Sequence, residues 1–233
     1  MNKTLIFAAT YNEADNVESL IKKIEKHSKN ADILIIDDNS PDGTKKILFK
    51  LQKRLKRLDV IVRRGKLGLD TAHKFAYNLA LKKGYTNLIT MDADLSHNPV
   101  EINKMIKILK NDEFVIGSRY MVGGKCEMSF IRTILSFFGN KFIKIFLNIN
   151  CSEFTTSYRG FNLKKLTKFN LNNVRSHGYS FFMETIVQLK RSGFNIKEIP
   201  ICFKNRVHGK SKIPKIEIFR TLKNVTLLYF KKN

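Results

Sequence analysis

The strongest constraint on the fold is an alternation of short apolar runs with amphipathic stretches through about the first 120 residues. The apolar runs predict strands over residues 4–9, 33–36, 60–62, 87–91 and 114–117. Helical periodicity between them predicts helices over 13–26, 44–57 and 71–83; the apolar face of the first consists of Val17, Leu20, Ile21 and Ile24. Strands that alternate with helices are typical of an α/β domain with a mostly parallel central sheet flanked by helices.

Three of the predicted strands end at acidic residues. Glu13 follows the first strand, Asp37 and Asp38 follow the second, and Asp92-Ala93-Asp94 follows the fourth. Ligands of open α/β sheets bind beyond the carboxyl ends of the strands, so we expect these carboxylates to line one site. A lone Asp-x-Asp turn is usually a helix cap. Beside other acidic strand ends, two carboxylates one residue apart predict Mg²⁺ or Mn²⁺ completed by phosphate oxygens.

The charge of the chain is strongly positive, with 43 Lys and Arg against 20 Asp and Glu, a net charge of +23. Such a balance favours nucleic acid, an anionic membrane surface or phosphorylated substrates, although a lysine-rich solubilising surface explains it as well. The chain has no zinc-finger spacing, no basic region with heptads and no RNP-like aromatic run. A basic nucleic-acid-binding module is therefore an alternative that leaves the acidic strand ends unexplained.

Cysteine usage and hydropathy bear on the compartment. Cys126, Cys151 and Cys202 are far apart and form no CxxC pair, which predicts a reducing cytosol without a disulfide or zinc framework. The longest stretch without Asp, Glu, Lys or Arg has nine residues, 4–12. This stretch is too short for a spanning helix, which needs about 20 apolar residues, or for a secretory signal.

Two apolar stripes at helical spacing lie in the later half of the chain. The first consists of Ile131, Leu135, Phe138, Phe142 and Ile145, and the second of Ile218, Leu222, Val225 and Tyr229. Such stripes usually face a core. Lysines flank both stripes, and a basic amphipathic helix can instead lie in a membrane interface, so both interpretations stay open.

Six short motifs follow one another along the chain: Thr10-Tyr11-Asn12-Glu13, Ile36-Asp37-Asp38-Asn39-Ser40-Pro41-Asp42-Gly43-Thr44, Lys66-Leu67-Gly68-Leu69, Met91-Asp92-Ala93-Asp94-Leu95-Ser96-His97, Gly117-Ser118-Arg119-Tyr120 and Arg206-Val207-His208-Gly209-Lys210-Ser211-Lys212. Each is weak alone, but their order and spacing are specific. Over residues 3–213 the set resembles the family 2 inverting glycosyltransferases, and among them the polyprenol (dolichol) phosphate mannosyltransferases.

The resemblance implies a fold, a reaction and a location. It implies a single GT-A-type domain over residues 1–213. The periodicity and lysines of the second stripe add a basic amphipathic helix over 214–233, at a membrane interface in the second of the two interpretations. The reaction would transfer a hexose, with mannose from GDP-mannose favoured, with inversion onto polyprenyl or dolichyl monophosphate, using Mg²⁺ or Mn²⁺. We expect a cytoplasmic protein, peripheral on an anionic membrane surface or held there by an anchoring partner. No binding of nucleic acid is expected. A sugar hydroxyl acceptor, in polysaccharide or glycolipid synthesis, is the alternative.

The resemblance also implies site residues by motif. The nucleotide sugar would contact Ala9, Tyr11, Glu13, Ile36, Asp38, Asp92, Ala93, Asp94, Arg119, Arg206 and Lys212. The metal would bind Asp92, Asp94 and Ser96, which stands where some relatives have Gln. The acceptor phosphate would contact Arg119, Arg132 and Ser136, and the catalytic residues would be Asp94 and Arg119.

Departures from the family pattern and acid–base chemistry refine this hypothesis. Ala9 replaces a Pro, Asp70 a Gly and Glu153 an Asp, and no transmembrane hairpin follows the domain.

A hydroxyl acceptor would need a general base, for which Glu153 and Glu184 are candidates. A lipid monophosphate, with a second pKa of about 6 if it behaves like phosphoserine, is already mostly a dianion and needs cations instead. The basic residues favour the phosphate acceptor.

Overall fold

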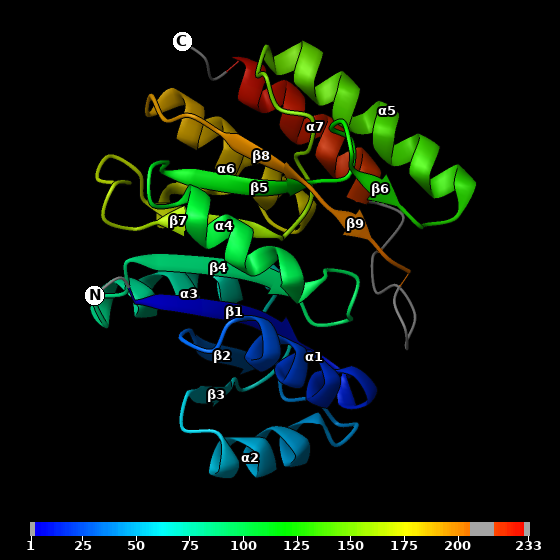
Figure 1. Cartoon of the computed structure of the whole chain (residues 1–233). Coiled ribbons are helices and arrows are strands. Elements are labelled where there is room, and N and C mark those ends of the chain that lie inside the picture. The colour runs from blue at the N-terminus through cyan, green and yellow to red at the C-terminus, as the bar shows by residue number, and fades with distance from the viewer. Residues whose placement is uncertain (1–2, 206–216, 231–233) are drawn as a thin grey trace.

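The computed structural model describes the chain over residues 3–205 and 217–230, with side chains of the last helix described from residue 223 on. Within these residues, the central sheet has the strand order β3-β2-β1-β4-β7-β5-β8 (Figure 1). Its strands are β1 (Thr4–Thr10), β2 (Asp32–Asp37), β3 (Leu58–Val62), β4 (Asn87–Asp92), β5 (Phe114–Ser118), β7 (Arg159–Asn162) and β8 (Lys197–Pro200). A small parallel pair, β6 (Lys125–Cys126) and β9 (Cys202–Phe203), lies beside it.

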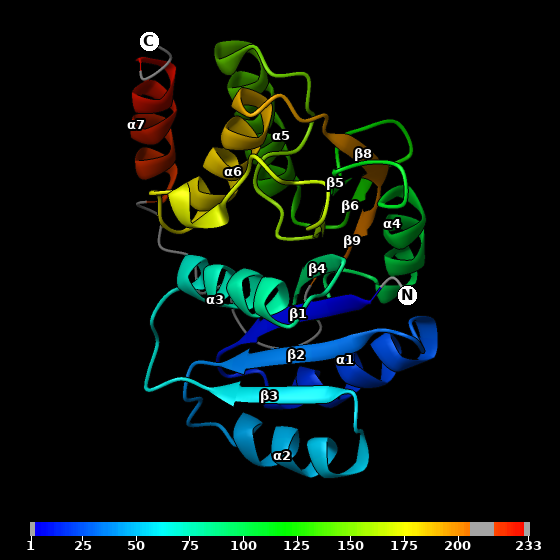
Figure 2. The ribbon, with the colours of Figure 1, turned by 90° about the vertical axis from the view of Figure 1, so that its left-hand side faces the viewer.

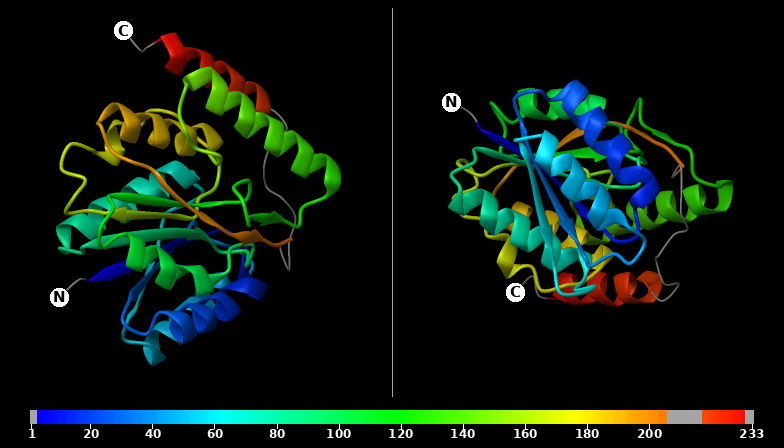
Figure 3. Two further views of the ribbon diagram at one scale, coloured as in Figure 1. Left: turned by 45° about the horizontal axis from the view of Figure 1, so that its top comes forward. Right: turned by 90° about the horizontal axis from the view of Figure 1, so that it is seen from below.

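Helices cover both faces of the sheet (Figures 2 and 3). One face packs against α1 (Ala14–His27), α2 (Thr44–Arg54) and α4 (Ile102–Ile108), and the other against α3 (Leu69–Lys82) and α6 (Tyr179–Arg191). The short 3₁₀ turns η1 (Pro99–Glu101) and η2 (Leu171–Asn173) lie between them in sequence. The predicted α/β fold with a mostly parallel sheet is confirmed.

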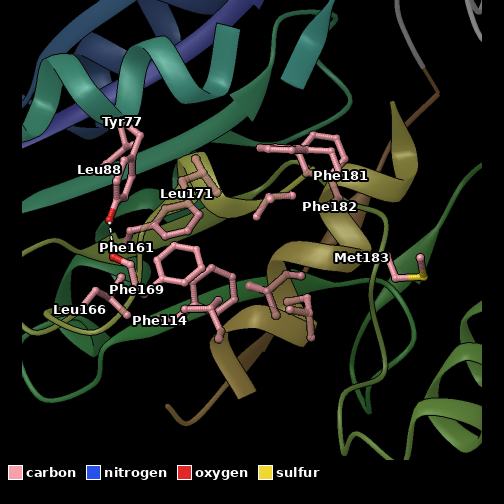
Figure 4. Close-up of a cluster of buried hydrophobic side chains, with 14 of the residues drawn as sticks. Tyr77, Leu88, Phe114, Phe161, Leu166, Phe169, Leu171, Phe181, Phe182 and Met183 are labelled. Atoms are coloured by element: carbon pink, nitrogen blue, oxygen red, sulfur yellow. Dashed lines mark hydrogen bonds between the residues drawn. The ribbon is translucent and has the colours of Figure 1, made fainter. Parts of the chain in front are cut away.

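Alternate residues of the strands enter two separate cores, as expected for a strand buried on both sides. In β1, Leu5 and Phe7 face the α3 and α6 side, and Ile6 and Ala8 face the α1 side. The predicted apolar face of α1 is buried, with each of its four residues at most 1 % exposed. On the other side aromatic rings fill the core, and the Tyr77 hydroxyl donates to the Phe169 carbonyl at 3.2 Å (Figure 4).

Strand β7 was not predicted, and it decides the geometry of the site. It runs antiparallel between β4 and β5, where Arg159 pairs with Thr90 on one side and Ile116 on the other. Because β7 is antiparallel, the residues before it lie at the edge where β4 and β5 end. Residues 153–158, which have no helix or strand of their own, therefore lie between the ends of these two strands.

Helices α5 (Phe130–Leu147) and α7 (Glu217–Phe230) lie side by side along one flank of the molecule (Figures 1 and 3). The rings of Phe146 and Tyr229 meet at 4.6 Å between centroids, and Arg191 of α6 donates to the Leu228 carbonyl at 2.6 Å. Among the described residues no helix is both long and apolar enough to cross a bilayer.

The interpretation of the first apolar stripe as core is wrong. The five stripe residues of α5 are between 45 % and 70 % exposed, and Phe130, the first residue of the helix, is 78 % exposed. The second stripe is mixed, because Val225 is buried and Tyr229 is 43 % exposed. The side chains of Ile218 and Leu222 lie outside the described residues.

Candidate active site

The predicted site residues of the first half meet at the carboxyl edge of the sheet. Ala9 near the end of β1 pairs with Ile36 of β2 on one side and with Asp92 of β4 on the other. The side chain of Ile36, one of the predicted nucleotide-sugar residues, is fully buried in the core. Asp37 is also buried, and it accepts hydrogen bonds from the Thr10 hydroxyl at 2.9 Å and from the Ser40 hydroxyl and amide, so it holds the turn rather than facing the edge.

The part of the site that is predicted to bind the nucleotide, around Asp38, contains an arginine that was not predicted from the sequence. Arg63, just after β3, donates to Asp38 Oδ1 at 2.5 Å, to the Gly68 carbonyl at 3.0 Å and to the Thr71 hydroxyl at 2.6 Å. It thus joins the end of β2 to the loop before α3. Nothing in the spacing of Arg63 indicated this role, because the pairing depends on β2 and β3 lying side by side.

Tyr11 and Glu13 lie on the neighbouring loop after β1. Lys66 Nζ lies 4.8 Å from the centre of the Tyr11 ring, a cation–π distance. The Glu13 carboxylate accepts from the Asn16 amide at 2.8 Å, and the Glu13 main-chain N–H donates to the Thr44 hydroxyl at 3.0 Å. The three loops that carry the first three motifs are therefore in mutual contact.

The Asp-x-Asp turn after β4 is held by side chains on both of its carboxylates. Asp92 Oδ1 accepts from the Ser157 hydroxyl at 2.6 Å, and the Asp92 side chain is 37 % exposed. Asp94 Oδ1 accepts from the amide of Ser96 at 3.1 Å and from its hydroxyl at 2.5 Å. Ser96 therefore supports Asp94 in this geometry, and Ala93 between the two aspartates is 4 % exposed.

His97 lies beneath this turn as a neutral imidazole. Its Nδ1 accepts from the Asp92 main-chain N–H at 3.0 Å, so the proton is on Nε2, which lies 3.1 Å from the Thr156 hydroxyl oxygen. Burial lowers the pKa of His97, although the charges of Asp92 and Asp94 partly oppose this effect. The contact of His97 with the Asp92 carboxylate, 3.7 Å, is therefore not an ion pair.

Arg119, just after β5, is fixed by a bidentate ion pair. Its Nε and Nη2 donate to the two oxygens of Glu153 at 2.7 and 2.9 Å, and Nη2 also donates to the Thr155 hydroxyl at 2.9 Å. The guanidinium lies 4.9 Å from the Tyr120 ring centre and 5.1 Å from that of Phe203. Nη1 donates to no acceptor among the described residues, which leaves one edge of the guanidinium for an anion.

The pKa values of the pair follow from burial and charge. Burial alone would lower the pKa of Arg119, but the charge of Glu153 outweighs it and the pKa is raised. Burial alone would raise the pKa of Glu153, but the charge and hydrogen bonds of Arg119 outweigh it and the pKa is lowered. Both groups are therefore charged at neutral pH.

One segment, residues 153–157, connects the two halves of the site. Glu153 and Thr155 hold Arg119, Thr156 contacts His97, and Ser157 holds Asp92. The Phe203 ring reinforces the connection, since it lies 5.3 Å from the His97 ring and stacks on Arg119. The Asp-x-Asp turn and the predicted catalytic arginine are thus parts of one network.

Two of the predicted acceptor residues, Arg132 and Ser136, lie on α5. The Tyr120 ring, next along the chain from Arg119, meets the Phe137 ring of α5 at 5.7 Å between centroids. Burial raises the pKa of Tyr120 to about 12, an effect that the charge of Arg119 opposes. Arg132 is exposed one helical turn before Ser136. Arg206 and Lys212, predicted to contact the nucleotide sugar, lie outside the described residues.

The carboxylates that could have served as general bases are used in internal contacts. Glu153 has no exposed surface, and both of its oxygens accept from Arg119. Glu184 is 5 % exposed and accepts from the main-chain N–H groups of Arg175 and Ser176 at 2.8–3.2 Å. The substituted Asp70 is also buried, with Oδ2 2.8 Å from His177 Nδ1.

Comparison with known proteins agrees with this geometry. Residues 6–169 match the family described as Glycosyl transferase family 2. The chain belongs to this family. As a family 2 glycosyltransferase it is an enzyme.

Two curated relatives of this glycosyltransferase act on lipid phosphates according to their names. The chain is 32 % identical to polyprenol monophosphomannose synthase of Mycolicibacterium smegmatis, over 91 % of this chain and 81 % of that protein. It is 30 % identical to undecaprenyl-phosphate mannosyltransferase of Micrococcus luteus, over 96 % of this chain and 93 % of that protein.

Among solved structures, glucosyl-3-phosphoglycerate synthase of Mycobacterium tuberculosis, in complex with Mn²⁺, UDP-glucose and phosphoglyceric acid, has a TM-score of 0.69. The match covers 98 % of this chain and 80 % of that chain at 13 % identity, and so it shows the fold alone. The expected single-domain GT-A architecture is confirmed by this likeness together with the family match.

Proposed function

We propose that this glycosyltransferase moves mannose from GDP-mannose onto polyprenyl monophosphate, with inversion and with a divalent metal, at the cytoplasmic surface of a membrane. The names of the two curated relatives support the sugar and the lipid phosphate acceptor. The observation that carries the proposal is the distribution of side chains around α5, the helix that bears the predicted acceptor residues.

Helix α5 has its amphipathic character reversed over residues 131–140. Its polar residues Thr133, Ser136 and Asn140 face the protein, and Asn140 is only 2 % exposed. The opposite face exposes large apolar side chains, with Ile131 at 70 % and Leu135 at 60 %. A contiguous exposed apolar face indicates a binding surface, and an amphipathic helix of this kind lies in a membrane interface.

This arrangement suits an acceptor that is apolar at one end and anionic at the other. The polyprenyl chain would stay in the bilayer against the outer face of α5. Its phosphate would reach the side of α5 where the Phe137 ring meets the Tyr120 ring and where Arg119 follows β5. Arg132, exposed at the start of the helix, would neutralise part of the charge.

The residues of the acidic turn fit a hard divalent cation. Asp92 and Asp94 are one residue apart in a non-helical turn, and each has one oxygen fixed by a serine. Among the described residues no group of three His, Cys, Asp or Glu side chains could bind a metal. Two carboxylates would leave the other positions to diphosphate oxygens and water, as Mg²⁺ prefers. When bound, the metal would stabilise the leaving diphosphate as a Lewis acid.

The transfer needs no base from the protein if the acceptor is a phosphate. A phosphate oxygen would attack C1 of mannose while the bond from C1 to the diphosphate oxygen breaks, and GDP would leave from the opposite face. Arg119, held by Glu153, would offer Nη1 as a preorganised donor to the charge on phosphate oxygens. The hydroxyl-acceptor alternative loses support, since Glu153 and Glu184 are both engaged.

A transfer assay tests the proposal. The purified protein is given labelled GDP-mannose or UDP-glucose, each with a short polyprenyl phosphate or with a sugar as the acceptor, with Mn²⁺ or Mg²⁺ and with a chelator as control. We expect labelled mannosyl lipid phosphate only with GDP-mannose and only with metal, and NMR should show an inverted anomeric centre. Transfer only from UDP-glucose, or only to a sugar hydroxyl, would contradict the proposal.

A further inference from the structure

Asn140 is the one side chain of α5, among the described residues, that hydrogen-bonds the segment 153–157. Its Nδ2 donates to the Ser136 carbonyl of its own helix at 2.8 Å. Its Oδ1 accepts from the main-chain N–H of Phe154 at 2.7 Å. Both residues are buried, with Asn140 2 % exposed and Phe154 fully enclosed. A buried main-chain N–H must keep a partner, so this bond ties the two segments together.

The segment that Asn140 holds is the one that organises the site. Glu153 and Thr155, on either side of Phe154, position Arg119, and Ser157 positions Asp92. From the opposite side, Arg159 donates to the carbonyls of Phe154 and Thr156 at 2.9 and 2.8 Å. The segment is therefore fixed to the sheet by Arg159 and to α5 by Asn140.

We propose that Asn140 is a positioning residue that couples the docking of α5 on a membrane to the geometry of the site. This inference rests on the proposed function. The outer face of α5 is apolar and exposed, whereas its inner face packs on the protein through Asn140, Ile143 and Leu147, so a bilayer that holds the helix sets its position relative to the sheet. Asn140 transmits that position to Phe154, and hence to the residues that hold Arg119 and Asp92.

The coupling predicts that vesicles stimulate turnover even of an acceptor that does not need them. The assay uses a short-chain, water-soluble prenyl phosphate with GDP-mannose, with and without vesicles that contain anionic lipid. We expect vesicles to raise the turnover of the wild-type protein by about tenfold or more, as misplacement of a site by about 1 Å costs up to about 100-fold. In Asn140→Ala this stimulation should be lost.

A matched variant separates coupling from general loss of stability. Asn162 is also a buried asparagine whose amide joins separate segments, since it donates to the Leu109 carbonyl at 2.7 Å and accepts from the Lys165 amide at 3.1 Å. It lies at the end of β7 away from the site. Asn162→Ala should keep the vesicle stimulation. In both variants, vesicle binding should match the wild type, and so should the metal-dependent GDP affinity measured without vesicles.

Hydrogen exchange of the Phe154 amide measures the same coupling and does not depend on turnover. Vesicle binding should slow exchange of the Phe154 amide in the wild type and leave it unchanged in Asn140→Ala. Two results would overturn the coupling and leave the proposed function intact. In the first, vesicles still stimulate transfer and still slow exchange of the Phe154 amide in Asn140→Ala. In the second, the wild-type protein transfers mannose, but vesicles neither stimulate the transfer nor slow the exchange. Absence of transfer by every variant, with the exchange effect present, would overturn the proposed function alone.

Discussion

The exposed apolar face of α5 gives the most direct prediction, because its contribution to the affinity of the protein for lipid vesicles can be measured. We consider the variant in which Ile131, Leu135 and Phe138 are all replaced by Ser. These side chains are 70 %, 60 % and 59 % exposed, so the protein itself gains little from them. We expect the variant to fold with almost unchanged stability and to bind vesicles much more weakly.

The size of the effect follows from the exposed area. Full burial of a Leu, Ile or Phe side chain is worth about 2 kcal/mol, so side chains about two thirds exposed can each contribute a little over 1 kcal/mol in a bilayer. The three together contribute at most about 4 kcal/mol, because a helix in the interface inserts its apolar face only partly. The partition coefficient should therefore fall by about 100- to 1000-fold, at about 1.4 kcal/mol per tenfold change.

The assay is sedimentation with vesicles of fixed anionic lipid content, at constant ionic strength so that charge attraction is equal in all samples. The matched control replaces Phe49, Phe75 and Leu81, which are 45 %, 43 % and 45 % exposed on α2 and α3. The control should bind vesicles like the wild type. Equal binding by the α5 variant and the wild type would refute the assignment of this face to the membrane.

Three further predictions concern single residues. Glu153→Gln should lower the free energy of unfolding by about 3 kcal/mol in urea titrations, because Arg119 stays charged and buried without its partner; adding Arg119→Met should restore some of the loss. Burial, with a smaller effect of the Arg159 charge, lowers the pKa of His73 to about 3. Below about pH 6.5 the unfolded chain therefore takes up a proton that the folded chain does not. The free energy of unfolding should fall by about 1.4 kcal/mol for each pH unit between about pH 6.5 and pH 3. Urea titrations of His73→Phe should show that slope removed, and an unchanged slope would contradict the assignment. Asp94→Ala should lose turnover and the Mn²⁺-dependent component of the thermal shift with GDP while keeping its fold; a retained shift would exclude Asp94 as a metal ligand.

Local pattern was sufficient for the first half of the fold, where each element has a clear periodicity of its own. The predicted strand over 87–91 is observed as Asn87–Asp92, and the predicted helix over 13–26 as Ala14–His27. The later half was different. Strand Arg159–Asn162 contains only four residues, with Arg at its start and Gly second, so neither alternation nor an apolar run marks it. Its place comes from the two strands on either side.

The site was predictable where motifs define it and unpredictable where pairing defines it. The acidic turn at Asp92 and Asp94 could be located from the strand before it. By contrast, the partner of Arg119 is 34 residues away and the partner of Asp38 is 25 residues away, so no spacing rule connects them. Glu153 was considered as a base on its chemistry alone, whereas the fold buries it against Arg119 and lowers its pKa.

The exposed stripe of α5 shows what periodicity measures. An apolar stripe at spacings of three and four establishes that a helix has one apolar face, but the period is the same whether that face meets a core or a lipid. The distinguishing information lies on the opposite face. A core-facing helix would turn polar residues to solvent, whereas α5 turns Ser136 and Asn140 inward, and the Asn140 amide bonds with Ser136 and Phe154 satisfy buried main-chain groups. The polar face of α5 is hydrogen-bonded inside the protein, so its apolar face is the one that is left to bind something outside the protein, and a lipid bilayer suits such a face.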